Sequence, residues 1–355
     1  MTPRERFLAT MNYQPVDRAP LRDFGVWPET LERWKEEGYD PNAVRFPVDQ
    51  WDIYGHWFLP HPPFQKEIVA EDDYTVTFVN HEGILMRERK DQPYSSMPQF
   101  LRFPVETRED FRKFYRERLQ PDLVNRIGAN WQEKLSAYRH RHVPLIIIAD
   151  RWGGFFGPLR NLMGVEKLCE TFCTDPAFVE EMMDGIADFM IAIMEQVLQF
   201  TTPDVFGFWE DMAFKNGPLI GADMVRRYML PRYRRVVDFL RSHGVDFISL
   251  DSDGDIRTLI PVWLDAGINV LYPFEVQSGM DVVQVRREYG KELRLWGGID
   301  KRVVAMGKEA IDRELERIAP LVREGGYVPT PDHSFPPDVS YSNYCYFMEQ
   351  LLKIL

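Results

Sequence analysis

Two short polar motifs, far apart in the sequence, contain residue types that acid–base and metal chemistry require. Asp251 and Asp253 stand two positions apart around Ser252, and Asp332 is followed by His333. Carboxylates at i and i+2, together with an imidazole from a distant segment, can place several donor atoms around one point. Such a set could bind a divalent cation or hold coupled protons if the fold brings the two motifs together.

A second interpretation of these residues needs no metal. His333 could form a hydrogen bond with Asp251 or Asp253 in an acidic pocket, and the carboxylate would then raise the pKa of the imidazole. An aspartate at the end of a strand can also simply cap the following helix, and Asp150 and Asp300 fit that role. The residues themselves leave these alternatives open.

Both motifs belong to a regular pattern in which a compact apolar run is followed by a long segment of helical period. Continuous apolar runs that alternate with helices indicate parallel strands, buried on both faces and joined by crossover connections. Eight runs fit this description: residues 19–23, 48–54, 143–150, 204–211, 245–253, 269–275, 293–300 and 327–333. The sequence therefore predicts one α/β domain over residues 1–355, a (β/α)8 TIM barrel. An open doubly wound sheet is the rival fold, but the glycine-rich phosphate turn typical of it is missing after the first run.

Two segments outside this pattern have signatures of their own. Residues 74–90 contain two β-like runs separated by His81, Glu82 and Gly83, which is the spacing of a β-hairpin. We expect this hairpin as an excursion from the barrel after its second strand. At the N-terminus, Thr2, Pro3 and Glu5 form the pattern of a capping box that opens a helix.

The carboxyl ends of all strands converge on one mouth of a barrel, whatever their separation in the sequence. The acidic and histidine residues at the predicted ends are Asp23, Asp52, Asp150, Glu210, Asp251, Glu275, Asp300 and His333. Among them we predict four catalytic residues: Asp52, Glu210, Asp251 and His333. The substrate-binding residues predicted at the same ends are Arg22, Arg151, Trp152, Trp209 and Lys301, because aromatic side chains indicate a cup wide enough for a flat or bulky apolar molecule. The cations among them could instead be ion-pair partners of the surrounding acids.

Composition restricts the partners and the location of the protein. The formal net charge of −12 argues against binding to a nucleic-acid backbone, which calls for clustered Lys and Arg. No apolar run reaches the roughly 20 residues of a membrane helix, and the N-terminus lacks the order of a signal peptide. We expect a cytoplasmic protein whose partner is a small-molecule substrate, with no nucleic acid and no membrane.

Four segments give the chain a resemblance to a known family. They are RERFLATMNYQPVDRAP (4–20), EDMAFKNGPLI (210–220), YMLPRYRRV (228–236) and DHSFPPDV (332–339). The chain resembles the uroporphyrinogen decarboxylase superfamily, which includes the corrinoid-dependent methyltransferases. The resemblance extends over essentially the whole chain, and it implies a (β/α)8 barrel.

The decarboxylase branch is matched only in part. Its arginine-rich loop after the first strand is reduced here to Arg22, while its aspartate after the second strand corresponds to Asp52 and its late histidine to His333. Its catalytic tyrosine falls near Leu162. Because an acidic cup is poorly suited to a substrate with eight carboxylates, decarboxylation of a tetrapyrrole assisted by Asp52 and Arg22 is the alternative prediction.

The methyltransferase branch holds zinc through a His-x-Cys pair after strand five and a Cys after strand eight. The resemblance places Asp251, Asp253 and His333 in those slots, with Glu210 as a fourth ligand or proton carrier. This harder donor set suits zinc and also admits manganese, iron or magnesium. The leading prediction is methyl transfer involving a corrinoid, free or on a corrinoid protein, or a methylated small molecule. A corrinoid- or tetrapyrrole-binding module without catalysis is a third possibility.

Overall fold

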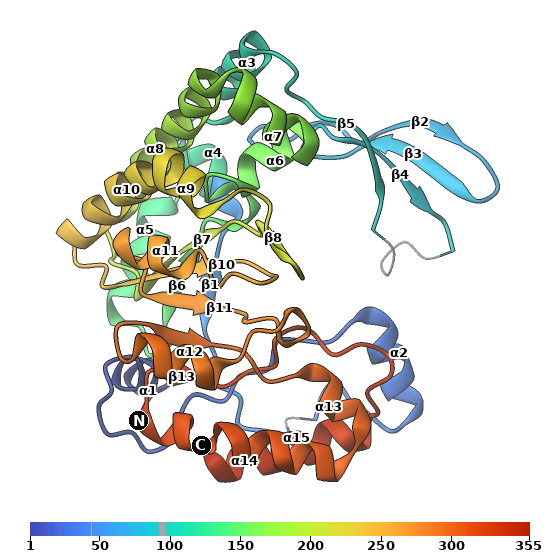
Figure 1. Cartoon of the computed structure of the whole chain (residues 1–355), viewed down its shortest axis with the longest axis vertical. Helices are drawn as coiled ribbons and strands as arrows, with labels where there is room; N and C mark the ends of the chain where they lie inside the picture. Colours follow the sequence, from blue (N-terminus) through green and yellow to red (C-terminus); the bar gives the residue numbers. More distant parts are fainter. Residues whose placement is uncertain (44, 92–96) are drawn as a thin grey trace.

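Seven of the eight predicted strands form one parallel sheet (Figure 1). The structure is a computed structural model that describes residues 1–43, 45–91 and 97–355, and the side chain of Asp150 lies outside what it describes. The strands follow one another in sequence order, each paired with its successor. They are β1 (Asp52–Tyr54), β6 (Leu145–Ile148), β7 (Val205–Trp209), β10 (Phe247–Asp251), β11 (Val270–Tyr272), β12 (Arg294–Trp296) and β13 (Tyr327–Val328). The mixed α/β fold with a parallel sheet is therefore confirmed.

The predicted first strand, residues 19–23, forms no strand of this sheet in the described chain. Its segment occupies the space between the two sheet edges: Leu21 accepts a hydrogen bond from the amide of Asp49, and Val26 forms an isolated parallel bridge with Phe335. A regular ladder cannot form because Pro20 has no N–H group, and the N–H of Leu21 donates to the carboxylate of Asp49 at 2.8 Å. The prediction of an eighth ladder strand is wrong for this reason.

The sheet is rolled so that its two edges approach each other. Trp51, immediately before β1, packs edge-on against Trp296 of β12 with ring centroids 4.8 Å apart. These strands are five positions apart in the sheet, which would separate them by roughly 24 Å if the sheet were flat. Phe7 of α1 (Pro3–Met11) contacts Trp51 from one end of the barrel, with ring centroids 5.0 Å apart. Inward-facing residues of the other strands join this cluster: Ile146, Val205, Phe247, Val270, Tyr272 and Val328.

Helices cover the outer face of the sheet, and their ends carry the expected capping residues. The predicted capping box is confirmed at α1, where the Thr2 side chain accepts from the amide of Glu5. Asp175 caps α8 (Pro176–Val197), and Ser340 caps α15 (Tyr341–Ile354). The remaining helices are α2 (Pro28–Glu36), α3 (Arg108–Arg118), α4 (Leu123–Ile127), α5 (Trp131–Ala137), α6 (Gly157–Met163), α7 (Val165–Thr174), α9 (Ala222–Met224), α10 (Leu230–Ser242), α11 (Ile260–Asp265), α12 (Val282–Tyr289), α13 (Lys301–Met306) and α14 (Lys308–Glu324). In the described part of the chain, none of the helices is both long enough and apolar enough to cross a bilayer.

A separate antiparallel sheet projects from the barrel between β1 and β6 (Figure 1). The region in which we expected a hairpin contributes β3 (Thr75–Val79) and β4 (Leu85–Arg89), which pair antiparallel, to a sheet of four strands. The outer strands are β2 (Glu67–Glu71) and β5 (Gln99–Arg102), and both are exposed along their whole length. Among the described residues of this sheet and its turns, Phe78, Ile84 and Met86 form a buried cluster.

Candidate active site

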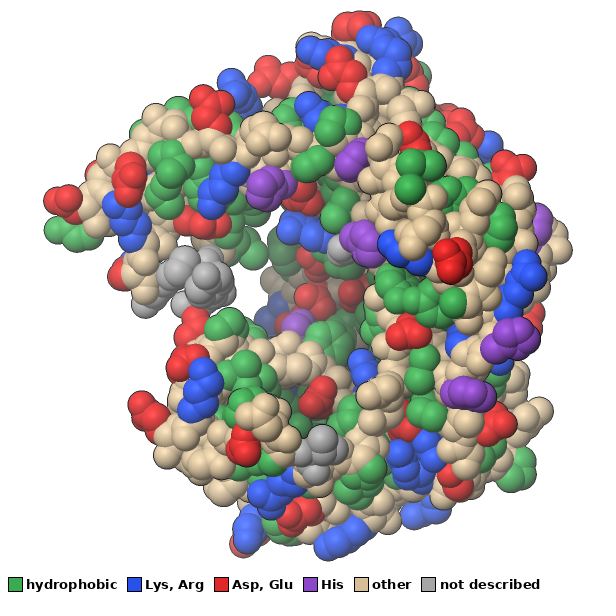
Figure 2. Space-filling model, turned by 180° about the vertical axis from the view of Figure 1, so that it is seen from behind, with side chains coloured by type: hydrophobic (Ala, Val, Ile, Leu, Met, Phe, Trp, Pro, Cys, Tyr) green, Lys and Arg blue, Asp and Glu red, His purple; other side chains and the backbone are tan. Residues whose placement is uncertain are grey.

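The carboxyl ends of the strands bring most of the predicted residues to one edge of the barrel. Glu210 follows β7, Asp251 ends β10, and His333 lies beyond β13. In Figure 1 the strand arrows end toward the opening between the projecting sheet and α2, where Figure 2 shows a deep hollow with acidic and histidine side chains on its walls. Ile53 is 44% exposed although it lies on the same face of β1 as the buried Trp51, so the barrel interior is open at this end.

Asp52 does not belong to this group. It is the first residue of β1 and pairs with Leu145, the first residue of β6. Because Trp51 faces the interior, side-chain alternation places Asp52 on the outer face, where it lines a cavity of about 640 Å³ with Tyr138 and Arg141. The predicted position of Asp52 at the mouth is wrong, because its side chain points to the outer face of β1 (Asp52–Tyr54) although the strand ends where it was expected to end.

His333 and Asp253 form a close pair at the mouth. The Nε2 atom of His333 lies 3.1 Å from Oδ1 of Asp253, and the two side chains are 25% and 41% exposed. Burial lowers the pKa of His333, but the hydrogen bond to Asp253 and the charges of Asp253 and Asp332 outweigh this effect, so the pKa is raised. This is the carboxylate–imidazole arrangement that the residue types left open, and it favours the protonated imidazole.

Glu210 has a different environment, because it is completely buried. Its carboxylate accepts hydrogen bonds from the amides of Phe155, Phe156 and Gly157 at 2.6–2.9 Å, and from the hydroxyl of Tyr233 in α10. These amides lie at the N-terminus of α6, where a negative charge is favourable. Desolvation nevertheless outweighs the hydrogen bonds and raises the pKa of Glu210 to about 6. Both oxygens of Glu210 accept hydrogen bonds, so the side chain links β7, α6 and α10. We call Glu210 with its four donors the latch.

Two glycines allow the chain after β6 to reach Glu210. A Cβ atom on Gly154 would lie 2.3 Å from the carbonyl oxygen of Trp209, and one on Gly157 would lie 2.6 Å from the Trp209 ring. Side chains at these positions would therefore force the loop away from β7. Residues 153–157 form a tight connection between β6 and α6, and it presents amide groups to the carboxylate of Glu210.

Trp209, the last residue of β7, is flanked by two guanidinium groups. The central carbons of Arg160 and Arg151 lie 5.0 and 5.7 Å from its ring centroid. Arg160 also forms an ion pair with Asp211 at 2.9 Å. Arg160 is therefore committed to Asp211, whereas substrate contact by Trp209 and Arg151 stays a prediction.

Trp152 lies away from the mouth. It is fully buried, stacks on Phe114 of α3 with ring centroids 5.5 Å apart, and donates a hydrogen bond from Nε1 to Glu82 at 3.0 Å. Since Glu82 lies in the turn between β3 and β4, Trp152 fastens the projecting sheet to the barrel. The prediction of substrate contact for Trp152 is not supported by this position.

The two remaining predicted cations, Arg22 and Lys301, are at the mouth. Arg22 lies over the ring of Trp51, 4.9 Å from the centroid, and donates to the carbonyl of Asp49 at 2.9 Å. Burial lowers its pKa, although the charges of Asp23 and Asp49 oppose this effect. Lys301 begins α13, and its charge is close enough to His333 to lower that pKa slightly against the larger influence of Asp253.

The predicted metal quartet of Asp251, Asp253, His333 and Glu210 does not assemble. Both oxygens of Glu210 are occupied, and Nε2 of His333 faces Asp253. Among the residues that the structure describes, no three His, Cys, Asp or Glu side chains are placed to hold a metal ion. The residues present therefore do not fit a zinc-type site, and the chemistry of the site is derived from its side chains alone.

Two supporting residues were not identified from the sequence. Tyr233 completes the bonding of Glu210, and Asp49 receives Arg6, Arg18 and the amide of Leu21. Tyr233 lies on the buried face of an amphipathic helix, where a tyrosine is indistinguishable from packing. Asp49 precedes β1 by three residues. Its role becomes visible only once it is known that residues 19–23 form no ladder and that the N–H of Leu21 donates to its carboxylate.

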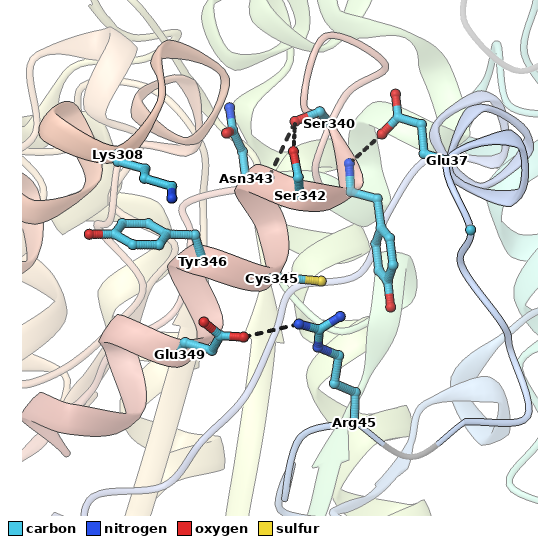
Figure 3. Close-up of a pocket in the computed structure, with 11 residues that line it drawn as sticks. Glu37, Arg45, Lys308, Ser340, Ser342, Asn343, Cys345, Tyr346 and Glu349 are labelled. Atoms are coloured by element: carbon cyan, nitrogen blue, oxygen red, sulfur yellow. Dashed lines mark hydrogen bonds and ion pairs between the residues drawn. The ribbon is translucent and has the colours of Figure 1, made fainter.

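A further cavity of about 790 Å³ lies on the outer surface between α2, α14 and α15 (Figure 3). Its charged groups are largely paired: Arg45 with Glu349 at 3.0 Å, and Glu37 with the amide of Tyr341 at 2.6 Å. None of the strand ends reaches it, so we place the candidate active site at the barrel mouth.

Comparison with known proteins agrees with this architecture. Across its whole length the chain is similar to a solved methyltransferase from Methanosarcina mazei, with 17% identity, a TM-score of 0.60, and coverage of 100% of this chain and 98% of the other. A B12-independent methionine synthase from Shewanella sp. W3-18-1 in complex with selenomethionine is a more distant match, at 11% identity and a TM-score of 0.39 over 62% of this chain and 64% of the other. A comparison with curated proteins gave no match. The model of the uroporphyrinogen decarboxylase (URO-D) family matches residues 123–353, and the chain therefore belongs to the URO-D family.

Proposed function

We propose that the protein is a methyl-transfer enzyme that binds a methylated small molecule in the barrel mouth and uses His333 as the general acid. The observation that carries this proposal is the pair of His333 and Asp253, with 3.1 Å between Nε2 and Oδ1. The pair lies at the open end of the barrel and contains a titratable group whose raised pKa favours the protonated form. The matched methyltransferase fold is the source of the reaction class.

The chemistry needs such a group. When a methyl group leaves a heteroatom, the bonding electrons stay on the heteroatom, which becomes a poor leaving group unless it receives a proton. His333 would supply that proton, while Asp253 orients the ring and stabilises its positive charge. A correctly placed general acid contributes about 10²–10⁴-fold to the rate.

The substrate would lie against the aromatic and apolar wall of the mouth. Trp209 offers a flat face bordered by Arg151, and Ile53 of β1 is also exposed. A reduced corrinoid, free or bound to a corrinoid protein, would supply the acceptor of the methyl group. The residues of this chain then bind the substrate, orient it and deliver the proton.

An anaerobic assay tests this function. Purified protein is mixed with reduced cobalamin and a panel of methoxylated aromatics and methylamines, and demethylated product is measured by mass spectrometry. We expect turnover of at least one compound, and a loss of about 10²–10⁴-fold in the His333→Asn variant. The matched control is His243→Asn. His243 is exposed at the C-terminal end of α10 and precedes β10, so it lies near the amino end of that strand and not at its carboxyl end.

One observation favours a second candidate, decarboxylation of a tetrapyrrole. Arg22 is a partly buried cation in the mouth whose hydrogen bond in the described ranges goes to the carbonyl of Asp49, so it could receive a substrate carboxylate. Asp52, its expected partner in this reaction, lies on the outer face. Steady formation of coproporphyrinogen from uroporphyrinogen would establish this alternative. Tight binding of cobalamin or porphyrinogen without any turnover would instead indicate a binding module.

A further inference from the structure

Asp332, the residue immediately before His333, accepts hydrogen bonds from two other strand-end segments. Its side chain is almost completely buried, with 1% of the residue exposed. Its Oδ2 atom accepts a hydrogen bond from the amide of Val276 at 3.0 Å, and its Oδ1 atom accepts one from the amide of Lys301 at 3.2 Å. The loop after β13 is therefore tied to the loop after β11 and to the start of α13.

Glu275, the residue before Val276, makes a second connection between loops. Its Oε2 atom accepts hydrogen bonds from the amide of Gly254 at 3.0 Å and from the hydroxyl of Ser278 at 2.7 Å. Gly254 follows Asp253 in the loop after β10. Glu275 therefore ties the loop after β11 to the loop that carries Asp253.

These contacts form a closed circuit, which we call the loop circuit. It consists of three pairs of consecutive residues, one pair on each loop: 253–254, 275–276 and 332–333. Two links between the pairs are the hydrogen bonds to Glu275 and Asp332, and the third is the contact of His333 with Asp253 at 3.1 Å. Because consecutive Cα atoms are only about 3.8 Å apart, a displacement at one link passes directly to the next.

The loop after β10 is packed closely enough to act as a fixed point of the loop circuit. Gly254 has a φ of +84°, and a Cβ atom on it would lie 2.4 Å from the carbonyl oxygen of Ala213. The next residue, Asp255, donates its amide to the carbonyl of Phe214 at 2.9 Å. This loop is thus seated on β8 (Ala213–Phe214), and the bond to Glu275 connects that seat to the other two loops.

We infer that Glu275 and Asp332 are positioning residues, which fix the loop circuit and thereby hold the imidazole of His333 on Asp253. The meaning of this role for catalysis rests on the proposed function, in which the imidazole is the general acid. A misplacement of about 1 Å at a catalytic group can cost about 10²-fold in rate. The loss should appear in kcat, because the two carboxylates act through His333 and not through binding of the substrate.

The Nε2–H resonance of His333 measures the contact directly by nuclear magnetic resonance of the full chain with isotope-labelled histidine. Because Nε2 faces a carboxylate, it carries a proton in the charged imidazole and in the neutral tautomer that Asp253 favours. Its resonance is identified by its loss in His333→Asn. We expect the wild type to show this resonance, because a proton held by Asp253 exchanges slowly with water.

Three variants test the two carboxylates. Glu275→Ala removes the acceptor of the Gly254 amide, and we expect the resonance to disappear. Glu275→Gln should keep it, because a single oxygen of Glu275 receives both of its bonds and the amide oxygen of glutamine can take that place. Asp332→Asn should lose it, because the two oxygens of Asp332 each receive a different amide and asparagine has only one acceptor oxygen.

Asp281→Ala is the matched control. Asp281 also follows β11 and accepts an amide, that of Val283 at 2.9 Å, but it caps α12 and is not part of the loop circuit. Its replacement should lower the midpoint of urea denaturation and keep the resonance of His333. The inference would be overturned by a resonance that persists in Glu275→Ala, or by its loss in Glu275→Gln or Asp281→Ala. Absence of the resonance in the wild type would overturn it as well.

Turnover gives a second, separable measurement. In the methyl-transfer assay Glu275→Ala should lower kcat about tenfold to 10²-fold and change KM less than about threefold, and Glu275→Gln should restore kcat. If the wild type has no turnover, loss of the resonance in Glu275→Ala and its retention in Glu275→Gln would still support the positioning role, while the proposed function fails. Equal kcat in wild type and Glu275→Ala would support the function and overturn the positioning role.

Discussion

Glu210 and Asp253 follow neighbouring strands at the same edge of the barrel, yet their carboxylates have opposite environments. Glu210 is fully buried and accepts hydrogen bonds from three amides and one tyrosine hydroxyl. Asp253 is 41% exposed, and within the part of the chain that the structure describes its side chain has one close partner, His333. From the sequence alone the two residues had the same status, as acidic groups at strand ends.

The difference between the two carboxylates shows what decides the role of such a residue. A carboxylate whose oxygens are saturated by fixed donors holds the backbone in place and has no capacity left for a ligand. A carboxylate with one partner and an accessible oxygen can take part in chemistry. Under the proposed function, the mouth of this barrel therefore has a structural side at β7 and a reactive side at β10 and β13.

The largest effect should come from removing the latch. In Glu210→Ala the three amides and the Tyr233 hydroxyl lose their acceptor inside the core, so we expect the free energy of unfolding to fall by about 3–5 kcal/mol. Urea denaturation measures this change. Asp338→Ala is a control on an exposed carboxylate and should change stability by less than about 0.5 kcal/mol. A loss below about 1 kcal/mol for Glu210→Ala would remove the distinction between the two sides.

A smaller loss should follow when only one donor of the latch is removed. Tyr233→Phe keeps the ring packed against Phe155 and Phe208 but removes the hydroxyl from the carboxylate. Because hydrogen bonds to charged groups contribute about 1.5–3 kcal/mol, we expect a loss of this size in the free energy of unfolding. Tyr346→Phe removes a comparable hydroxyl from Asp312 on the surface and should have a clearly smaller effect. Equal losses in the two variants would argue against a buried latch.

Much of this architecture could be predicted from the sequence, because buried parallel strands are continuous apolar runs. Seven of the eight predicted strands are in the sheet, including β12 with only three residues. The segment at residues 19–23 has the same composition but no ladder, since its backbone donors are absent at Pro20 or taken by Asp49. Composition records apolar character, whereas ladder formation depends on a side chain far away in the sequence.

The site was predicted less completely, for two physical reasons. Asp52 was assigned to the mouth because it lies near the end of its predicted strand, but side-chain alternation along β1 turns it to the outer face. Trp152 was assigned to the mouth because it follows a strand, but its ring turns toward the projecting sheet. Strand ends predict which residues reach an edge, and they do not predict which way the side chains turn there.

The pH dependence of stability tests the charge state of the latch. The pKa of Glu210 is raised from 4.5 to about 6 by desolvation. A raised carboxyl pKa stabilises the folded state fully below pH 4.5, and this stabilisation is lost as the pH rises through about 6, a change of roughly 2 kcal/mol. Glu210→Gln cannot titrate, so the difference in unfolding free energy between wild type and variant should shift by this amount across the window. A constant difference would mean that the four donors offset the desolvation and leave the pKa of Glu210 at its ordinary value.

The smallest effect on stability should come from the reactive side. Asp253→Asn removes the charge beside His333, but the pair is partly exposed, at 41% and 25%, so we expect a loss of at most about 1 kcal/mol. The sign depends on pH: Asp253 raises the pKa of His333 above its ordinary value of 6.5, so the stabilisation is fully present below pH 6.5 and disappears as the pH rises through the raised pKa. Urea denaturation at about pH 5.5 and about pH 8.5 should therefore show the loss only at the lower pH.

In the methyl-transfer assay the Asp253→Asn variant should lose activity at lower pH than the wild type does, because its imidazole gives up the proton at lower pH. A loss of stability as large as that of Glu210→Ala, independent of pH, would identify Asp253 as a second latch and leave the mouth without a reactive side.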